Sequence, residues 1–348
     1  MWQNLEKEFT EKYGRKPLVI AAPGRVNLIG EHTDYNEGFV LPGAVDKCIY
    51  VAMAQNDSAN INVFARQFNE SASFPVNEQS PRQGWLNYLI GVNYLLQEKT
   101  GRTTGGLDVM IDGDIPVGAG MSSSAALCSA FGFGLNHVFD LGQSRMELAR
   151  IGQQTEHRFV GVKCGIMDQF ASLHGRKGHV MKLDCRSMEF EYIPFNFPDV
   201  RIVLVNTMVS HSLAGSEYNL RRQQCEEGVK IMKKYLPEIH SLRDVPYEQL
   251  AKHWQEFPPV VYERCSYVIS ENQRLLTGCD ALRNNDLQGF GEMMFGSHKG
   301  LSRHYAVSCP ELDSLVELAR PMPQVLGARM MGGGFGGCTI NVVQADQV

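Results

Sequence analysis

The chain has little that would take it into or across a membrane. None of its 348 residues lies in an apolar run close to the roughly 18 residues of a membrane span, and mixed charges begin at Glu6, too early for a signal peptide. No C-x-x-C pair occurs, and the nine cysteines are scattered, which argues against a zinc site and a disulfide framework. Scattered free thiols are typical of a reducing compartment. We therefore predict a cytoplasmic protein without a membrane partner.

The chain also lacks an excess of positive charge and the usual nucleotide-binding signatures. Its net charge of −5 argues against a nucleic-acid partner. There is no Gly-Lys dipeptide, hence no P-loop, and the H-R-D and D-F-G signatures of protein kinases are missing. Gly332 to Gly337 matches G-x-G-x-x-G, but a strand-like segment follows where a dinucleotide-binding fold requires a helix. We predict a mobile or closely packed glycine loop between two strands, with a simple hairpin turn as the alternative.

The order of the remaining patterns indicates an α+β fold class rather than regular βαβ alternation. At roughly 100–200 residues per domain, the length suggests two domains, which we place at residues 1–187 and 188–348. Ser144 and Glu147 have the spacing of a helix capping box. Strands are expected at 18–22, 48–54, 60–65, 106–111, 178–184, 201–206, 325–331 and 338–343, and helices at 2–13, 85–98, 122–137, 144–158, 216–235, 259–285 and 310–319.

A serine-rich turn between a strand-like run and a helix-like run is the most informative segment. Gly118 and Gly120 lack side chains, so the backbone there can approach a ligand closely. Ser122, Ser123 and Ser124 fall where the new helix has unpaired N–H groups, which favours phosphate, and a serine hydroxyl can also bind magnesium. The alternative is a glycine turn with an ordinary serine N-cap. Two glycines and three serines together favour an anion site.

A polar run, residues 22–35, begins at the end of the first expected strand. Arg25 can stabilise a transferred phosphoryl group or a neighbouring carboxylate. Glu31, His32 and Asp34 provide acceptors and a donor at close spacing, as recognition of several sugar hydroxyls requires. One histidine with two carboxylates is weak evidence for a metal site. A solvated loop with a surface ion pair remains an equal alternative at this point.

Two further carboxylates are candidates for chemistry. Asp168 lies among Ile166, Met167 and Phe170, so it needs a partner if it is buried, and it could serve as a base or charge partner for an attacking hydroxyl. The alternative is an aspartate in the first turn of a partly exposed helix. Glu156 could be a second magnesium ligand, although a solvent-facing helix glutamate is the simpler interpretation.

Together these segments resemble the galactokinase family, a branch of the GHMP small-molecule kinases, over essentially the whole chain. Pro23 to Tyr35 is similar to the sugar signature of that family, Gly118 to Ala125 to its ATP-phosphate loop, and Gly332 to Gly337 to its third motif. Gly165 to Phe170 and Gly215 to Asn219 also resemble family segments.

The resemblance implies phosphorylation of the anomeric hydroxyl of galactose by ATP with Mg²⁺. We expect the protein to be a monomer. Asp168 would face that hydroxyl beside Arg25, and Ser124 and Glu156 would hold the magnesium ion. The implied sugar-binding residues are Glu31, His32, Asp34, Asp168 and Tyr218, and the implied ATP-binding residues are Trp85, Gly118, Ala119, Gly120, Met121, Ser122, Ser123, Ser124 and Ala125. Trp85 has a core aromatic as its alternative.

The implied fold is an N-terminal domain like the second domain of ribosomal protein S5 and a C-terminal ferredoxin-like domain, with the active site in the cleft between them. Relatives are expected to continue past the third motif with a further helix and strand, whereas this sequence stops at Val348. Two alternatives remain: a kinase for N-acetylgalactosamine or another sugar, and a non-catalytic sensor of galactose and ATP. Sensors lose residues in the serine-rich turn, and all are present here, which disfavours that alternative.

Overall fold

The computed structural model describes residues 1–116, 120–209 and 214–348. The chain forms two compact units that interleave along the sequence. The first contains Met1–Arg25, Ala44–Val117 and Met121–Gly175, and the second contains Val26–Gly43, Gly118–Gly120 and Arg176–Val348. This division follows contacts between residues; the predicted domain boundary between residues 187 and 188 stays a prediction.

The first unit is built on one five-stranded mixed sheet with the order β1-β3-β6-β4-β5. Its strands are β1 (Leu18–Asn27), β3 (Pro42–Gln55), β4 (Asn60–Ala65), β5 (Glu70–Pro75) and β6 (Leu107–Gly113). β6 pairs with β3 in the antiparallel sense and with β4 in the parallel sense. β6 is buried along its whole length, as expected for a central strand covered on both faces.

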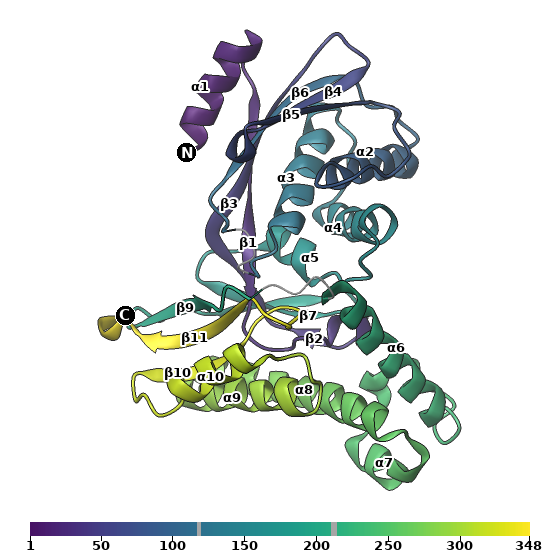
Figure 1. Ribbon diagram of the computed structural model, residues 1–348, viewed down its shortest axis with the longest axis vertical. Coiled ribbons are helices and arrows are strands. Elements are labelled where there is room, and N and C mark those ends of the chain that lie inside the picture. Colours follow the sequence, from purple (N-terminus) through teal and green to yellow (C-terminus); the bar gives the residue numbers. More distant parts are fainter. Residues whose placement is uncertain (117–119, 210–213) are drawn as a thin grey trace. The chain divides into compact units, whose positions relative to one another are not determined.

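Helices cover both faces of this sheet. They are α1 (Trp2–Tyr13), α2 (Leu86–Thr100), α3 (Ser123–Val138), α4 (Arg145–Thr155) and α5 (Met167–His174). Figure 1 shows α2 to α5 together on one face and α1 on the other. α1 packs Leu5 and Phe9 against Ala52 and Met110 of the sheet. β1 thus brings Arg25 to this unit, and the start of α3 brings Ser122, Ser123 and Ser124.

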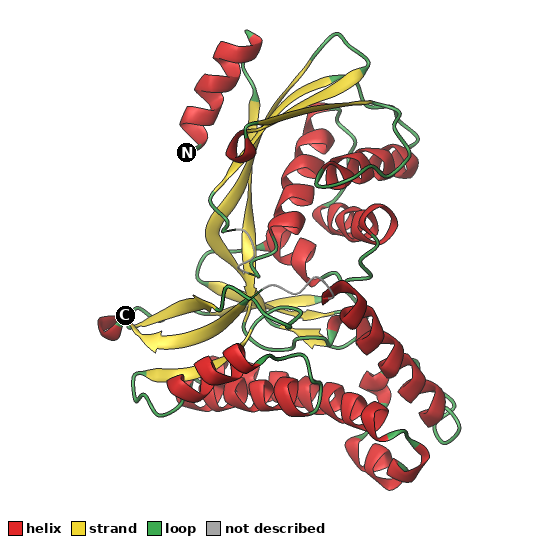
Figure 2. Cartoon of the chain, viewed as in Figure 1, coloured by secondary structure: helices red, strands yellow, loops and turns green. Residues whose placement is uncertain are grey.

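The second unit combines two three-stranded sheets with a group of helices, drawn by type in Figure 2. One sheet has the order β2-β7-β8 and the other β10-β11-β9. The strands are β2 (Phe39–Val40), β7 (His179–Asp184), β8 (Phe190–Pro194), β9 (Val200–Asn206), β10 (Val325–Met330) and β11 (Cys338–Gln344), and the helices are α6 (Ala214–Met232), α7 (Tyr247–Lys252), α8 (Pro259–Arg283), α9 (Leu287–Arg303) and α10 (Pro310–Ala319).

Glycine allows α9 to lie directly on β10. A side chain added at Gly291 would come within 1.7 Å of the Leu326 carbonyl oxygen, and one added at Gly327 within 2.6 Å of the Gly291 Cα. These two glycines therefore permit a helix–strand approach that any larger residue would block.

The α+β fold class is confirmed, as are the expected helix at 2–13 and the strand at 60–65. The predicted capping box is present, with the Ser144 side chain accepting from Glu147 N–H and the Glu147 carboxylate accepting from Ser144 N–H. The sequence patterns missed β2, β5, β8, α5, α7 and α9. In the described part of the chain, the helices are too short or too polar to cross a bilayer.

Candidate active site

The end of β1 and the serine-rich turn touch through their backbones in the first unit. Arg25 N–H donates to the Met121 carbonyl oxygen at 3.1 Å. A side chain at Gly24 would lie 2.7 Å from that same oxygen, so glycine is needed at this position. The sequence Pro23-Gly24-Arg25 therefore brings the guanidinium group of Arg25 next to the turn that begins α3.

Arg25 and Asp168 form a two-pronged ion pair. Arg25 Nε donates to Asp168 Oδ1 and the terminal nitrogen Nη2 to Oδ2, both at 2.9 Å. Arg25 is buried, whereas the Asp168 side chain keeps 28% of its surface exposed, so the carboxylate is reachable from solvent. Asp168 also lies in the first turn of α5, where the helix dipole favours a negative charge. Asp168 is thus the aspartate in the first turn of a partly exposed helix that the residues alone offered as one alternative, and its role as a base stays a prediction.

Ser122 joins this pair. It adopts a left-handed backbone conformation with φ 55° at the N-cap of α3, and its side chain makes no capping bond to the helix. Its Oγ instead donates to Asp168 Oδ2 at 2.5 Å. A left-handed non-glycine residue costs about 1–2 kcal/mol, and such strain clusters at functional sites. The ordinary N-cap alternative for this serine is therefore not what the structure contains.

Glu156 is held close to the start of α3. Its Oε1 accepts from Ser124 Oγ at 3.3 Å and from Gln169 Nε2 at 3.1 Å. Glu156 is buried and opens a single π-helical turn, Glu156–Val160, that follows α4. Burial, and then the charge of nearby Asp168, raise the pKa of Glu156 to about 7. A solvent-facing helix glutamate, the simpler interpretation from sequence, is wrong.

The other predicted ATP-binding residues lie at different places in the fold. Met121 and Ala125 are buried, Ser123 is the first residue of α3, and Gly120 has φ +69°. Gly118 and Ala119 lie outside the described residues. Trp85 lies at the N-cap of α2 and donates its indole N–H to Glu70 at 3.2 Å.

In the second unit, Glu31 connects the polar run to the glycine-rich turn. Its Oε1 accepts from Gly332 N–H at 2.8 Å and from Arg329 at 3.0 Å. Arg329 is fully buried and also donates to the carbonyl oxygens of Leu28 and Met330. A buried guanidinium is stable only when its donors are satisfied. Arg329 thus fixes the backbone that carries Glu31, a role that no sequence signal indicated.

His32 has φ 62° and lies in a cluster of tyrosines. Its Nδ1 is 2.7 Å from the Tyr35 hydroxyl, and its Nε2 is 3.2 Å from the Gly333 carbonyl oxygen. The Tyr218 and Tyr305 rings lie with their centroids 5.2 and 4.9 Å from that of the imidazole. Burial lowers the pKa of His32 to about 4, although Glu31 opposes the shift, so the ring is neutral at physiological pH.

Asp34 is half-buried and begins a short 3-10 turn, Asp34–Asn36, where its Oδ1 accepts from Tyr35 N–H. Tyr218 is half-buried on α6, and its ring lies 5.1 Å from that of Tyr35. Glu31, His32, Asp34 and Tyr218 are therefore all in the second unit, three of them on one loop.

The glycine-rich segment is a loop between β10 and β11, as predicted, and not the start of a helix. Gly332, Gly334, Gly336 and Gly337 all have positive φ. A side chain at Gly334 would come within 2.1 Å of the Val307 carbonyl oxygen. The glycine-rich loop is therefore closely packed, one of the arrangements predicted from the sequence.

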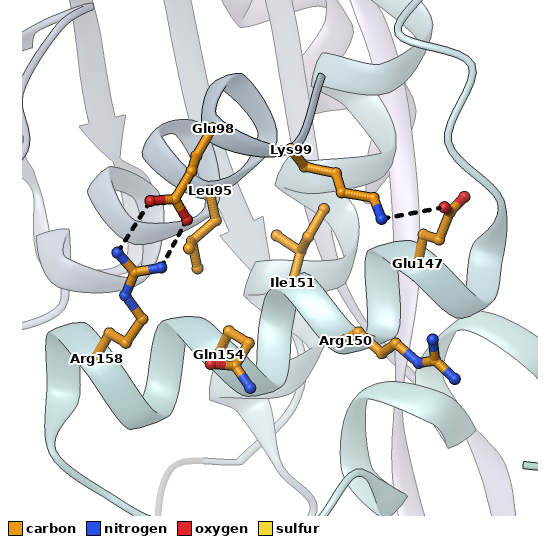
Figure 3. Close-up of a pocket in the computed structure, with 8 residues that line it drawn as sticks. All are labelled: Leu95, Glu98, Lys99, Glu147, Arg150, Ile151, Gln154 and Arg158. Atoms are coloured by element: carbon orange, nitrogen blue, oxygen red, sulfur yellow. Dashed lines mark hydrogen bonds and ion pairs between the residues drawn. The ribbon is translucent and has the colours of Figure 1, made fainter. Parts of the chain in front are cut away.

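Within residues 1–116, 120–209 and 214–348, no group of three or more histidine, cysteine, aspartate or glutamate side chains could hold a metal ion. A surface pocket of about 220 Å³ lies between α2 and α4 (Figure 3). Two ion pairs, Glu98–Arg158 and Lys99–Glu147, lie around it, and Ile151 is among the residues that line it. It contains no predicted site residue, so we assign it no part in the chemistry.

Comparison with sequence families gives three matches along the chain. Residues 7–55 match the galactokinase galactose-binding signature, residues 87–176 the GHMP kinases N terminal domain, and residues 280–348 the GHMP kinases C terminal domain. The galactokinase of Chloroflexus aurantiacus is 44% identical, covering 98% of this chain and 87% of that protein. A Haemophilus influenzae galactokinase is 40% identical, covering 99% and 90%.

Solved structures are similar over the same length. The crystal structure of Lactococcus lactis galactokinase complexed with galactose has a TM-score of 0.94 at 33% identity, covering 99% of this chain and 91% of that one. The Methanococcus jannaschii mevalonate kinase has a TM-score of 0.67 at 16% identity, covering 95% and 92%, which shows a common fold alone.

Proposed function

The chain belongs to the galactokinase family of the GHMP kinases, and from this premise we propose which residues carry out each part of the reaction. It is an ATP-dependent sugar kinase that transfers the γ-phosphate of ATP to the anomeric hydroxyl of α-D-galactose, giving galactose 1-phosphate and ADP. The Arg25–Asp168 pair beside the serine-rich turn is the observation that carries the residue assignment.

Asp168 and Arg25 act on the attacking hydroxyl. The partly exposed Asp168 carboxylate accepts the hydroxyl's hydrogen bond and takes its proton as the bond from the anomeric oxygen to the γ-phosphorus forms. The bond between that phosphorus and the β,γ-bridging oxygen breaks, and ADP leaves with its electron pair. Arg25 keeps Asp168 in place and stabilises negative charge that develops beside it.

The serine-rich turn binds the phosphates of ATP. Because Ser122 directs its hydroxyl to Asp168 and not to the helix, the first N–H groups of α3 have no capping side chain from that residue. Such a helix start favours anions. The residues that we assign to ATP are Trp85, Gly118, Ala119, Gly120, Met121, Ser122, Ser123, Ser124 and Ala125.

Ser124 and Glu156 fit a magnesium ion. They present two hard oxygen atoms 3.3 Å apart. Mg²⁺ usually takes one or two carboxylates together with substrate phosphates, so a larger cluster of acidic side chains is not required. When bound, the ion would neutralise charge on the phosphates. Gln169 donates to the same Glu156 oxygen at 3.1 Å and so helps to orient the carboxylate.

Glu31, His32, Asp34 and Tyr218 bind the hydroxyls of galactose, together with Asp168. A buried polar group that pairs with a substrate hydroxyl is left unpaired when an analogue without that hydroxyl binds. Such analogues are therefore rejected, which provides specificity. Both ring nitrogens of His32 already have partners within the protein. A sugar hydroxyl that binds His32 therefore either replaces one of these two hydrogen bonds or adds to them.

We assign the protein to the cytoplasm as a monomer. Its nine cysteines are free thiols, which suits a reducing compartment. Light scattering during gel filtration measures the mass, and a value near 38.9 kDa supports the monomer, whereas twice that mass overturns it.

The direct test measures ADP release from ATP and magnesium with galactose, glucose or N-acetylgalactosamine, in the native sequence and in Asp168→Ala. Asp112→Ala is the matched control, because Asp112 forms a comparable ion pair with Arg66 at 2.7 Å. We expect turnover with galactose that falls by about 10²-fold or more in Asp168→Ala and stays in Asp112→Ala. Equal losses in both variants would remove the catalytic assignment, and galactose binding without ADP release would favour the sensor.

A further inference from the structure

A series of hydrogen bonds in the second unit runs from Cys225 through two tyrosines and His32 to the Gly333 carbonyl oxygen. Cys225 Sγ lies 3.3 Å from the Tyr305 hydroxyl, which lies 2.7 Å from the Tyr35 hydroxyl. Tyr35 in turn contacts His32 Nδ1, and His32 Nε2 contacts Gly333 O. The four side chains come from α6, from the segment after α9 and from the polar run, so only the folded protein brings them together.

The donor and acceptor of every bond in this series follow from its last member, the Gly333 carbonyl oxygen. A backbone carbonyl oxygen can only accept, so Nε2 of His32 must carry the hydrogen that bridges to Gly333. The imidazole is neutral, so its Nδ1 has no hydrogen and must accept from Tyr35.

Tyr35 has one hydrogen, which it gives to His32, so its oxygen accepts from Tyr305. Tyr305 in turn accepts from the thiol of Cys225. All three donors keep their protons at neutral pH, because burial raises the pKa of Cys225 to about 11 and the pKa values of both tyrosines well above 10. The reverse direction would place two acceptors, Nε2 and the Gly333 oxygen, against each other.

We propose that Cys225, Tyr305 and Tyr35 form a one-directional hydrogen-bond relay that holds His32 as its Nε2–H tautomer, and that Tyr35 and Tyr305 are positioning residues for galactose recognition. The inference about galactose rests on the proposed function, in which His32 binds a sugar hydroxyl. A fixed Nε2–H makes His32 a donor, so the sugar oxygen that meets it is an acceptor.

The relay also orders the glycine-rich turn. Glu31 accepts from Gly332 N–H, while His32 donates to the carbonyl of Gly333, so two neighbouring side chains hold both sides of one dipeptide. Among the described residues, the charges of Glu31, Arg221 and Arg329 act on the imidazole. A fixed tautomer keeps the Nε2–H donor opposite Gly333 O. A ring with its hydrogen on Nδ1 would instead place an unprotonated Nε2 against that oxygen, and the two acceptors would repel each other.

The test of the relay is ¹⁵N NMR of protein labelled at histidine, with the His32 signals assigned from a His32→Gln variant. We expect an unprotonated Nδ1 and a protonated Nε2 at neutral pH. Tyr35→Phe should shift the Nδ1 signal strongly, Tyr305→Phe less, and Cys225→Ser least, because the perturbation lies one bond further away at each step. A protonated Nδ1 in the native sequence overturns the relay.

Tyr267→Phe is the matched control. Tyr267 is as buried as Tyr305, and the two tilted rings lie with their centroids 4.7 Å apart. The Tyr267 hydroxyl donates to the Glu31 carbonyl oxygen, outside the relay. A purely structural effect of losing a hydroxyl would appear in this variant too. We expect the His32 nitrogen signals to stay in place in Tyr267→Phe, and equal shifts in both variants would contradict the proposal.

Binding and kinetics test the link to galactose. Loss of a hydrogen bond to a buried acceptor predicts about a tenfold rise in the galactose Kd and KM of Tyr35→Phe, with the KM for ATP unchanged. An unchanged galactose Kd with a shifted Nδ1 signal would overturn the positioning role. If the native protein shows no galactose turnover, the proposed function fails, but the NMR result still decides the relay.

Discussion

The buried carboxyl group of Glu156 leads to a quantitative prediction about stability and pH. Its pKa in the folded protein is about 7 instead of 4.5. Glu156→Gln removes the ionisation and keeps an oxygen that can accept from Ser124 and Gln169. The difference of 7 − 4.5 in pKa corresponds to about 3 kcal/mol, since one unit is about 1.4 kcal/mol.

The sign follows from the direction of the shift. Folded Glu156 binds its proton more tightly than the unfolded chain does, so its favourable contribution is complete below pH 4.5 and is lost as the pH rises towards 7. As the pH rises from 4.5 to about 7, the unfolding free energy of Glu156→Gln should therefore increase by about 3 kcal/mol relative to that of the native sequence.

Urea unfolding of both proteins at several pH values from roughly 5 to 8 captures most of this change. Glu147→Gln is a control of opposite sign, because hydrogen bonds from Ser144 lower the pKa of Glu147. Parallel curves for the native sequence and Glu156→Gln would refute a raised pKa of Glu156.

The same carboxyl group links magnesium to proton release. A bound cation requires the ionised form, so binding of magnesium and ATP near pH 7 should release about half a proton from Glu156. Calorimetry in two buffers of different ionisation enthalpy measures this number. Its absence in Glu156→Gln would support the assignment, and equal release by both proteins would contradict it.

Further predictions concern local structure. Gly334→Ala and Gly332→Ala impose the same unfavourable φ of +85°, but only at Gly334 would the new methyl group meet backbone, 2.1 Å from the Val307 carbonyl oxygen. Gly334→Ala should therefore lower the melting temperature clearly more than Gly332→Ala, and equal losses would contradict the packed turn. Ser144→Ala should lower the unfolding free energy by about 1 kcal/mol, measured by urea unfolding, because it removes a helix cap; no loss would show that the capping box contributes nothing.

Local patterns predicted elements whose stability is mainly local, but not those formed by tertiary contacts. The capping box of α4 is readable because its partners are three residues apart. α9 was missed because it contains four glycines, which weaken a helix signal. Two of them are explained by packing, since Gly291 lies against Leu326 and Gly300 against Tyr267.

The same distinction applies to the candidate site. The residue types of Arg25 and Asp168 suggested their chemistry, but their pairing joins residues 143 positions apart. The burial of Glu156 and of Arg329 depends on contacts from distant segments and leaves no trace in local sequence. The relay from Cys225 to His32 likewise joins residues that are far apart in the sequence, so no local pattern predicts it.

The central claim is phosphoryl transfer to the anomeric hydroxyl of galactose. ³¹P and ¹H NMR of the product formed from ATP, magnesium and galactose tests it most directly. We predict one sugar phosphate in which phosphorus couples to the anomeric hydrogen of the α-anomer, together with an equal amount of ADP. Phosphate on any other carbon, or ADP formed without a sugar phosphate, would contradict the account.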